Sequence, residues 1–249
     1  MANPYETDAL LRAYLLLHFG NAADIFDGLP GPENAVDFPA RCVRELRDPA
    51  ARASSALDVG CAVGGSSFEL ARHCERVTGI DYSRGFIDAA RELAASGHMD
   101  SLSPVEGDRV QPFRAKVDPA IDRPRVSFAV GDAMNLDPGL ENFDIVLAAN
   151  LICRLPDPRV FLARLPSLVK PGGQLLLATP FSWLEDYTPK ENWLGGDRPS
   201  FDVLTEILSP DFDLELRVEL PFVIREHARK FQYGVSLGSR WRRKLPTPR

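Results

Sequence analysis

A glycine-rich turn between an apolar run and a helical segment constrains the fold of this chain most strongly. The run LDVGCAVGG occupies residues 57–65, and SSFELARHCE follows it with helical spacing. Glycines let the backbone turn sharply, and the amides at the start of the next helix then face a bound ligand. The feature therefore predicts a strand–turn–helix unit with a ligand site at the carboxyl end of the strand.

The same alternation of strand and helix continues along the chain. Residues 84–96 and 158–169 have helical spacing, and they are flanked by the short apolar runs RVTGIDYS, RVSFAVGDA, FDIVLAANLI and QLLLATPF. Short buried strands that alternate with helices favour a parallel sheet with crossover helices. We therefore expect an α/β fold whose ligands bind at the carboxyl ends of the strands.

Several segments lie outside this alternation. Two helices are predicted near the N-terminus, and a hairpin that turns at Glu106-Gly107-Asp108 is predicted within the long link before the third strand. Two final strands are expected as an antiparallel pair at the sheet edge. The segments are residues 5–20 and 37–47 for the helices, 98–125 for the link, 213–221 and 230–241 for the final strands, and 182–199 for an aromatic and acidic segment after the fifth strand.

Composition limits the class of protein. The chain of 249 residues carries 35 acidic and 29 basic residues, so its net charge of −6 argues against a nucleic-acid binder that depends on a broad basic field. No apolar run approaches the roughly 18–20 residues of a membrane-spanning helix, and no signal-peptide core begins the chain. We expect a cytoplasmic protein with one domain over residues 1–249. The four cysteines, Cys42, Cys61, Cys74 and Cys153, are scattered along the chain. We therefore expect them to be reduced thiols and to form no metal site.

Acidic residues at the predicted strand ends indicate what the site binds. Asp81 ends the second strand, where a carboxylate can accept both hydroxyl protons of a ribose, and Asp132 follows the third strand, where it can meet an adenine. NAD is one candidate, but Ala62 replaces the second glycine of its fingerprint. Asp58, just before Gly60, suits a cation better than a pyrophosphate. S-adenosylmethionine carries a sulfonium and an ammonium group, so a nearby carboxylate favours it.

The motifs LDVGCAVGG, GIDYS, GDA, FDIVLAAN and LVKPGGQLLLATPF together resemble the class I S-adenosylmethionine-dependent methyltransferase family over residues 55–181. The resemblance implies a Rossmann-like seven-stranded sheet with an antiparallel last strand, a helical lid over residues 1–50, and a substrate segment with final strands over 182–249. It also implies S-adenosylhomocysteine as product. The implied cofactor contacts are Asp58, Gly60, Cys61 and Gly64 at the methionine part, Asp81 and Tyr82 at the ribose, Asp132 and Ala133 at the adenine, and Asn150 below the methyl group.

A narrower resemblance comes from segments outside these motifs. YETDALLRAYLLLHFG, ANLICRLPDP, TPFSWLEDYTPKENWLGG and RKFQYGVSLGSRWRR look like the methyltransferase that completes ovothiol biosynthesis. That family implies methyl transfer to an imidazole ring nitrogen of 5-thiohistidine (4-mercaptohistidine), with a sulfoxide synthase as functional partner. Two alternatives stay open: a class I methyltransferase for another small metabolite, and a nicotinamide oxidoreductase or non-catalytic nucleotide-binding module.

An imidazole nitrogen with a free lone pair is already a competent nucleophile, so the site needs control of the tautomer more than a strong base. Asn150, Tyr14 and His18 are the candidates for this role. Tyr14 and His18 are four residues apart and share a helix face. The alternative for these two residues is a packed core face, and the alternative for Asn150 is a helix or turn cap. The candidate substrate contacts are Tyr5, Tyr14 and His18 on the predicted lid, Trp183 and Tyr187 after the fifth strand, Arg154 and Arg229 for a carboxylate (with Arg225 and Lys230 as further options), and Glu185 or Asp186 for an ammonium group.

Overall fold

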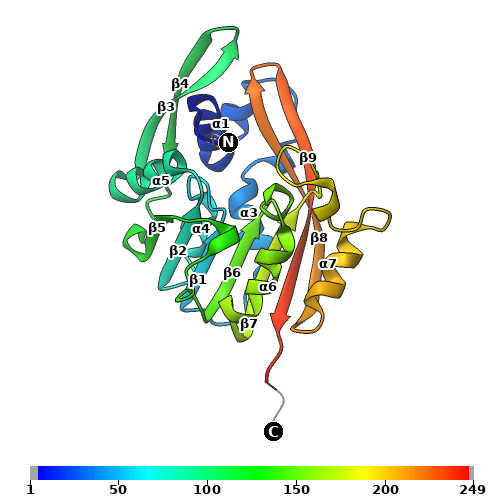
Figure 1. Ribbon diagram of the computed structural model, residues 1–249. Coiled ribbons are helices and arrows are strands. Elements are labelled where there is room, and N and C mark those ends of the chain that lie inside the picture. The colour runs from blue at the N-terminus through cyan, green and yellow to red at the C-terminus, as the bar shows by residue number, and fades with distance from the viewer. Residues whose placement is uncertain (1–4, 247–249) are drawn as a thin grey trace.

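The computed structural model describes residues 5–246, and the first four residues of the predicted lid lie outside that range. Seven strands form one sheet in the order β5-β2-β1-β6-β7-β9-β8 (Figure 1). The parallel strands are β1 (Ser55–Val59), β2 (Arg76–Asp81), β5 (Val126–Val130), β6 (Phe143–Ala149) and β7 (Val169–Thr179). Because β9 (Lys230–Arg243) runs antiparallel to both β7 and β8 (Phe212–His227), the predicted antiparallel last strand is confirmed.

Alternation along the buried strands builds two cores, one on each face of the sheet. On β6, Ile145 and Leu147 join one core while Val146 and Ala148 join the other. Successive side chains of a strand point to opposite faces, so a continuous apolar run is what a sheet covered on both sides requires. The first core includes residues of α1 (Asp8–Phe19), α2 (Ala22–Phe26), α3 (Phe38–Leu46), α4 (Gly65–Leu70) and α5 (Arg84–Ser96), and the second those of α6 (Pro158–Leu168) and α7 (Ser200–Leu208).

The helix ends follow local sequence signals. Thr7 caps α1, since its Oγ1 accepts a hydrogen bond from the Leu10 N–H at 3.3 Å. Gly97 ends α5 with φ 82°, a left-handed conformation that glycine adopts without strain. The predicted hairpin is confirmed as β3 (His98–Glu106) and β4 (Arg109–Lys116), a separate two-stranded sheet. The sequence patterns did not predict α2 or α7, and they made the final two strands too short.

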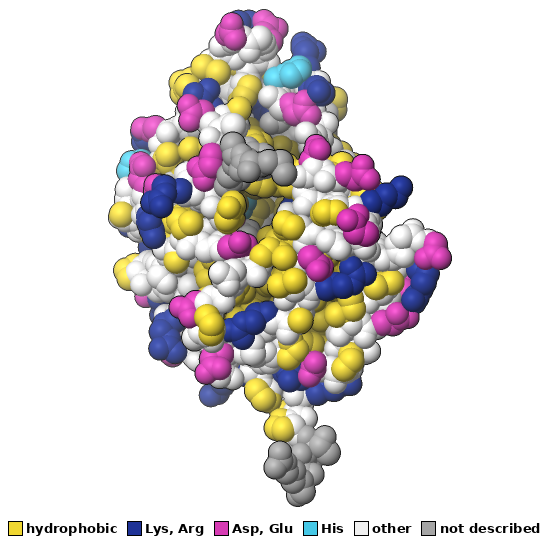
Figure 2. All heavy atoms as spheres, viewed as in Figure 1, with side chains coloured by type: hydrophobic (Ala, Val, Ile, Leu, Met, Phe, Trp, Pro, Cys, Tyr) yellow, Lys and Arg dark blue, Asp and Glu magenta, His cyan; other side chains and the backbone are white. Residues whose placement is uncertain are grey.

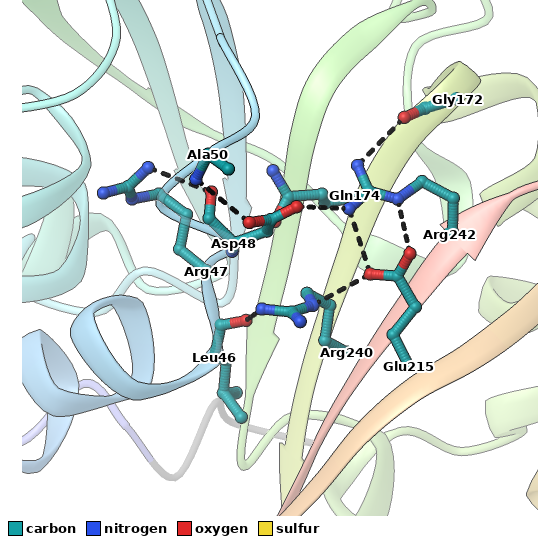
Figure 3. Close-up of polar contacts among 9 residues, drawn as sticks. All are labelled: Leu46, Arg47, Asp48, Ala50, Gly172, Gln174, Glu215, Arg240 and Arg242. Carbon is teal, nitrogen blue, oxygen red and sulfur yellow. Dashed lines mark hydrogen bonds and ion pairs between the residues drawn. The ribbon is translucent and has the colours of Figure 1, made fainter.

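Two arginines of the basic run RWRRK near the C-terminus, Arg240 and Arg242, form ion pairs on β9, where Arg242 is the strand partner of Gln174 on β7 (Figure 3). Arg242 binds Glu215 and Asp48 at 2.8 Å each, and Arg240 binds Glu215 at 2.9 Å. Gln174 of β7 accepts the Asp48 N–H at 2.7 Å. These guanidinium groups tie β9 to β8 and to the segment after α3.

On the face shown in Figure 2, Lys and Arg side chains are interspersed with Asp and Glu side chains, without a broad region of one sign. No helix in residues 5–246 is long and apolar enough to cross a bilayer. The same residues contain no group of three or more His, Cys, Asp and Glu side chains placed to hold a metal ion.

Candidate active site

A cavity of about 380 Å³ lies at the carboxyl ends of the parallel strands. It extends across the sheet from Asp132, just after β5, past Asp81 at the end of β2 and Asn150 after β6, to Phe222 on β8. α1, the start of α3 and the segment after β7 complete its wall. The volume lies within the range of small-molecule sites. It is lined at one end by Val59, Gly60, Ala62, Ser66, Ile80, Asp81, Tyr82, Gly131, Asp132, Ala133 and Met134, and elsewhere by Tyr5, Tyr14, Leu17, His18, Phe38, Pro39, Phe86, Ala149, Asn150, Leu151, Arg154, Leu155, Pro156, Asp186, Tyr187, Phe222 and Ile224.

The glycine-rich turn reaches this cavity at Gly60 and Ala62. Gly60 has φ 78° and Ala62 has φ 45°, so the backbone turns through two left-handed residues here. A carboxylate holds the strained alanine in place, since Asp81 Oδ2 accepts the Ala62 N–H at 2.9 Å. The side chain of Cys61 is fully buried behind the turn. Gly64 is needed for packing: a Cβ at this position would lie 2.6 Å from Cζ of Phe128. Cys61 and Gly64 are not among the residues that line the cavity, so their contact with the cofactor stays a prediction.

Asp58 is also buried, and it organises the turn from behind. Its Oδ2 accepts hydrogen bonds from the hydroxyls of Ser66 and Ser67 at 2.7 and 2.6 Å, which fixes the start of α4. Burial raises the pKa of Asp58 to about 6, although the two hydroxyl donors oppose the rise. Because the side chain does not line the cavity, the prediction that Asp58 touches the ligand is not supported by its position.

Asp81, Tyr82, Asp132 and Ala133 line one end of the cavity, as predicted. Asp81 uses its oxygens to accept the N–H groups of Ala62 and Ser83, at 2.9 and 2.8 Å, and a carboxylate keeps further lone pairs for a ligand. Burial raises its pKa, against the effect of these backbone donors. Asp132 accepts the Met134 N–H at 2.8 Å and so shapes the turn after β5.

Tyr5 and the α1 residues Tyr14 and His18 reach the cavity from the N-terminal segment. Burial, together with nearby Asp81, raises the pKa of Tyr14 to about 12, so its phenol is a neutral donor near neutral pH. Burial and the neighbouring tyrosines raise the pKa of Tyr5 still further. The rings of Tyr5 and Tyr14 meet edge to face with centroids 6.2 Å apart. Both phenols fit a role as hydrogen-bond donors and not as bases.

His18 connects α1 to the glycine-rich turn. Its Nδ1 accepts the N–H of Gly65 at 3.0 Å, so the proton of the neutral ring lies on Nε2. Burial lowers the pKa of His18 to about 3. The ring therefore stays neutral, and its Nδ1 lone pair is used in holding α1 against the first turn of α4.

This histidine predicts a pH-dependent stability. The unfolded imidazole binds a proton near pH 6.5, whereas the folded one stays neutral to about pH 3. Because the unfolded state then binds more protons, the stabilisation is complete above pH 6.5 and falls as the pH is lowered. Between pH 7 and pH 5 we expect the wild type to lose about 2 kcal/mol more unfolding free energy than His18→Asn. The asparagine side chain would still offer an acceptor to Gly65 but cannot titrate. Denaturant unfolding at both pH values checks this, and equal losses in the two proteins would contradict it.

Asn150 occupies the centre of the cavity, in a left-handed conformation with φ 55°. Its N–H donates to the carbonyl of Ala178 on β7 at 2.7 Å. Its Oδ1 accepts a hydrogen bond of 2.7 Å from the hydroxyl of Ser236, a fully buried residue of β9. With its carbonyl oxygen engaged in this way, the amide NH₂ of Asn150 is the group left to donate to a ligand.

Arg154 and Asp186 bring charge of both signs to the cavity, next to the phenol of Tyr187. The guanidinium carbon of Arg154 lies 5.1 Å from the ring centroid of Tyr187, and Nη1 donates to the carbonyl of Ser182 at 2.7 Å. These bonds fix the guanidinium at the cavity wall. Asp186 is the residue of the predicted Glu185/Asp186 alternative that lines the cavity.

The structure does not bring Trp183 or Arg229 to the cavity. The indole N–H of Trp183 donates to the hydroxyl of Ser200 at 3.1 Å, and the side chain packs against the second core. Arg229 lies in the β8–β9 turn, where its N–H donates to His227 Nδ1 at 3.2 Å. Arg225 is buried and donates to the carbonyls of Asp24, Ile25 and Pro104. These three predicted or optional substrate contacts therefore lie outside the cavity lining.

The charges of the cavity favour a cation. Among the described residues that line it, Asp81, Asp132 and Asp186 are acidic and Arg154 alone is permanently positive, because His18 is held neutral. An opposite charge in a partly buried site interacts more strongly than in water. The acidic side chains that line the cavity thus suit a cationic ligand.

Comparisons with known proteins agree with this geometry. A family model described as a methyltransferase domain matches residues 57–177. The ubiquinone biosynthesis O-methyltransferase of Coxiella burnetii is 28% identical over 123 residues, which are 49% of this chain and 42% of that protein. The match therefore spans less than half the length of this curated relative.

Solved structures with low sequence identity share the fold. The N-methyltransferase NodS from Bradyrhizobium japonicum, in complex with S-adenosylhomocysteine, superposes with a TM-score of 0.56 at 20% identity and covers 94% of this chain and 99% of its own. The [4+2]-cyclase SpnF gives a TM-score of 0.58 at 16% identity, over 88% of this chain and 85% of its own. Because a cyclase has this fold too, the fold alone does not fix the reaction.

Residues 57–177 thus match a methyltransferase domain, and S-adenosylmethionine is the methyl donor that the sequence motifs predict for it. The predicted Rossmann-like sheet is confirmed. The predicted enzyme class, a methyltransferase, and its predicted cofactor, S-adenosylmethionine, are confirmed as well. The matches carry no information about an acceptor of the ovothiol type.

Proposed function

We propose that this chain transfers a methyl group from S-adenosylmethionine to an imidazole ring nitrogen of 5-thiohistidine, the reaction of ovothiol biosynthesis. The observation that carries the proposal is that one basic and one acidic side chain, Arg154 and Asp186, both line the cavity where it also meets the ring of Tyr187. An amino acid brings a carboxylate and an ammonium group, which these two side chains complement, and its ring suits a wall of phenols. A sulfoxide synthase would supply this acceptor.

The cofactor is proposed to bind along the β1, β2 and β5 ends. Asp81 would accept the ribose hydroxyls, Asp132 and Ala133 would meet the adenine, and Gly60 and Ala62 would lie at the methionine part. S-adenosylmethionine supplies a methyl group on a sulfonium and becomes S-adenosylhomocysteine. Tyr82, which is 61% exposed at the cavity edge, would cover the ribose.

The protein residues would then align and shield the acceptor. Asn150, held by Ser236, presents its NH₂ to the acceptor at the centre of the cavity, and Tyr14 offers a neutral phenol close by. These donors can fix which ring nitrogen keeps its proton and which has a free lone pair. Alignment and exclusion of water account for most of the acceleration in such a transfer, so no strong base is required. A misplaced thiol would be methylated instead, so the orientation of the ring decides the product.

The test is incubation of the purified protein with 5-thiohistidine and S-adenosylmethionine carrying a labelled methyl group. We expect the label on a ring nitrogen, located by NMR of the product. Label on sulfur, or none, would contradict the proposal. Histidine, a phenol and an aliphatic amine in parallel reactions would identify a methyltransferase for another small metabolite, which the similarity to an O-methyltransferase supports as the second candidate.

A further inference from the structure

The β8–β9 hairpin closes the side of the cavity opposite the proposed cofactor end. Phe222 and Ile224 of β8 line the cavity together with Phe38 and Pro39 at the start of α3. The rings of Phe38 and Phe222 pack with centroids 5.2 Å apart. We call Phe38, Pro39, Phe222 and Ile224 the apolar wall. It carries no charge, in contrast to Arg154 and Asp186, which line the same cavity.

A glycine on the adjacent strand determines where the central ring of this wall lies. Phe222 pairs directly with Gly234 of β9. A Cβ at position 234 would lie 2.5 Å from Cζ and 2.7 Å from Cε1 of Phe222, so the ring covers the bare backbone of the glycine. Gly234 does not have a left-handed φ, so its backbone conformation does not demand glycine. The requirement is steric: any larger residue must lift the ring away from β9.

We propose that the apolar wall receives the uncharged face of the acceptor ring, and that Gly234 sets the depth of this part of the site. The inference rests on the proposed function for the identity of the acceptor, and it adds the residues that select it. Ser236, two residues further along β9, fixes Asn150, so the hairpin that forms the wall also fixes the centre of the cavity. A ring seated on the wall would have its charged substituents directed to Arg154 and Asp186.

The experiment compares Gly234→Ala with Gly238→Ala. Gly238 lies on the same strand, and a Cβ there would lie 2.6 Å from Cδ1 of Leu220, a residue that does not line the cavity. In Gly234→Ala the added methyl group must lift the Phe222 ring away from β9. We expect this overpacking to lower kcat/KM for 5-thiohistidine about tenfold or more. The affinity for S-adenosylhomocysteine should change less than about twofold. Gly238→Ala should lose stability but keep its kcat/KM for the acceptor.

A second background tests whether the effect passes through Phe222. In the Phe222→Leu variant the ring no longer covers position 234, so adding Gly234→Ala should change kcat/KM less than about threefold. The same tenfold loss in both backgrounds would overturn the proposal. So would equal effects of the two glycine substitutions on methyl transfer.

A binding measurement separates this inference from the proposed function. Indole, a planar uncharged probe, is titrated into the protein saturated with S-adenosylhomocysteine and followed by ligand-observed NMR. Indole should bind to the wild type and to Gly238→Ala and bind at least about tenfold more weakly to Gly234→Ala. If this pattern holds while no imidazole is methylated, the proposed acceptor is wrong and the wall stands. If indole binds all three proteins equally or none of them, the wall is wrong whatever the acceptor.

Discussion

Replacing Asn150 with glycine is expected to lower kcat for methyl transfer about 100-fold, because the acceptor loses the group that orients it. The dissociation constant of S-adenosylhomocysteine should change less than about threefold. Glycine is the appropriate replacement since Asn150 has φ 55°, where alanine would add backbone strain of its own. Steady-state kinetics and calorimetry on the same preparation check the two values.

The hydrogen bond from Ser236 provides the control for this prediction. Ser236→Ala removes the partner of Asn150 Oδ1 and should lower kcat about tenfold, with no further loss when it is combined with Asn150→Gly. Ser239→Ala is the matched variant, since Ser239 is a buried serine of β9 whose hydroxyl accepts the Trp241 indole N–H instead. An unchanged kcat in Asn150→Gly, or a Ser239→Ala loss equal to that of Ser236→Ala, would remove Asn150 from the centre of the reaction.

Replacing Asp81 with alanine is expected to weaken S-adenosylhomocysteine binding by roughly 1.5–3 kcal/mol, as for the loss of charge-assisted hydrogen bonds. Two effects add here: the ribose loses its acceptor, and the N–H of Ala62 loses the carboxylate that holds the glycine-rich turn. Titration calorimetry measures the change.

Asp137→Ala is the matched control for Asp81. This exposed aspartate also accepts a backbone N–H, that of Gly139 at 2.8 Å, but lies outside the cavity lining. Its substitution should leave the dissociation constant unchanged. A folded Asp81→Ala protein that binds S-adenosylhomocysteine as tightly as the wild type would exclude Asp81 from the cofactor site.

The sheet could be predicted from the sequence because its signals are local. Each parallel strand is a short apolar run, and the turn after β1 is marked by LDVGCAVGG. α2 was missed because it has only five residues, Ala22–Phe26, too short for helical periodicity to appear. The last two strands extend beyond their predicted ends because they pair with each other in a long hairpin past the edge of β7.

The predicted site residues line the cavity where backbone position alone decides their place, and lie outside its lining where side-chain direction decides it. Asp81 and Asp132 follow strand ends and so reach the cavity. Asp58 lies within β1, and its side chain turns to two serine hydroxyls behind the glycine-rich turn. Ala62, which has a left-handed φ of 45°, lines the cavity, whereas Cys61 does not. No sequence pattern specifies that angle in advance.

The part of the site farthest along the chain could not be predicted. Phe222 and Ser236 were missed because their places depend on how β8 pairs with β9 and on the distance between β9 and Asn150, which are long-range contacts. The alternation of small residues in the segment GVSLGS, at Gly234, Ser236 and Gly238, is the one signal that marks this strand as a close neighbour of other groups.

The central claim is that the carboxylate-lined cavity at the carboxyl ends of β1, β2 and β5 binds the methyl donor. Titration calorimetry of the purified protein with S-adenosylhomocysteine and, separately, with NAD tests it most directly. We expect saturable one-to-one binding of S-adenosylhomocysteine that Asp81→Ala weakens, and no measurable heat with NAD. Binding of NAD without any response to S-adenosylhomocysteine would contradict it.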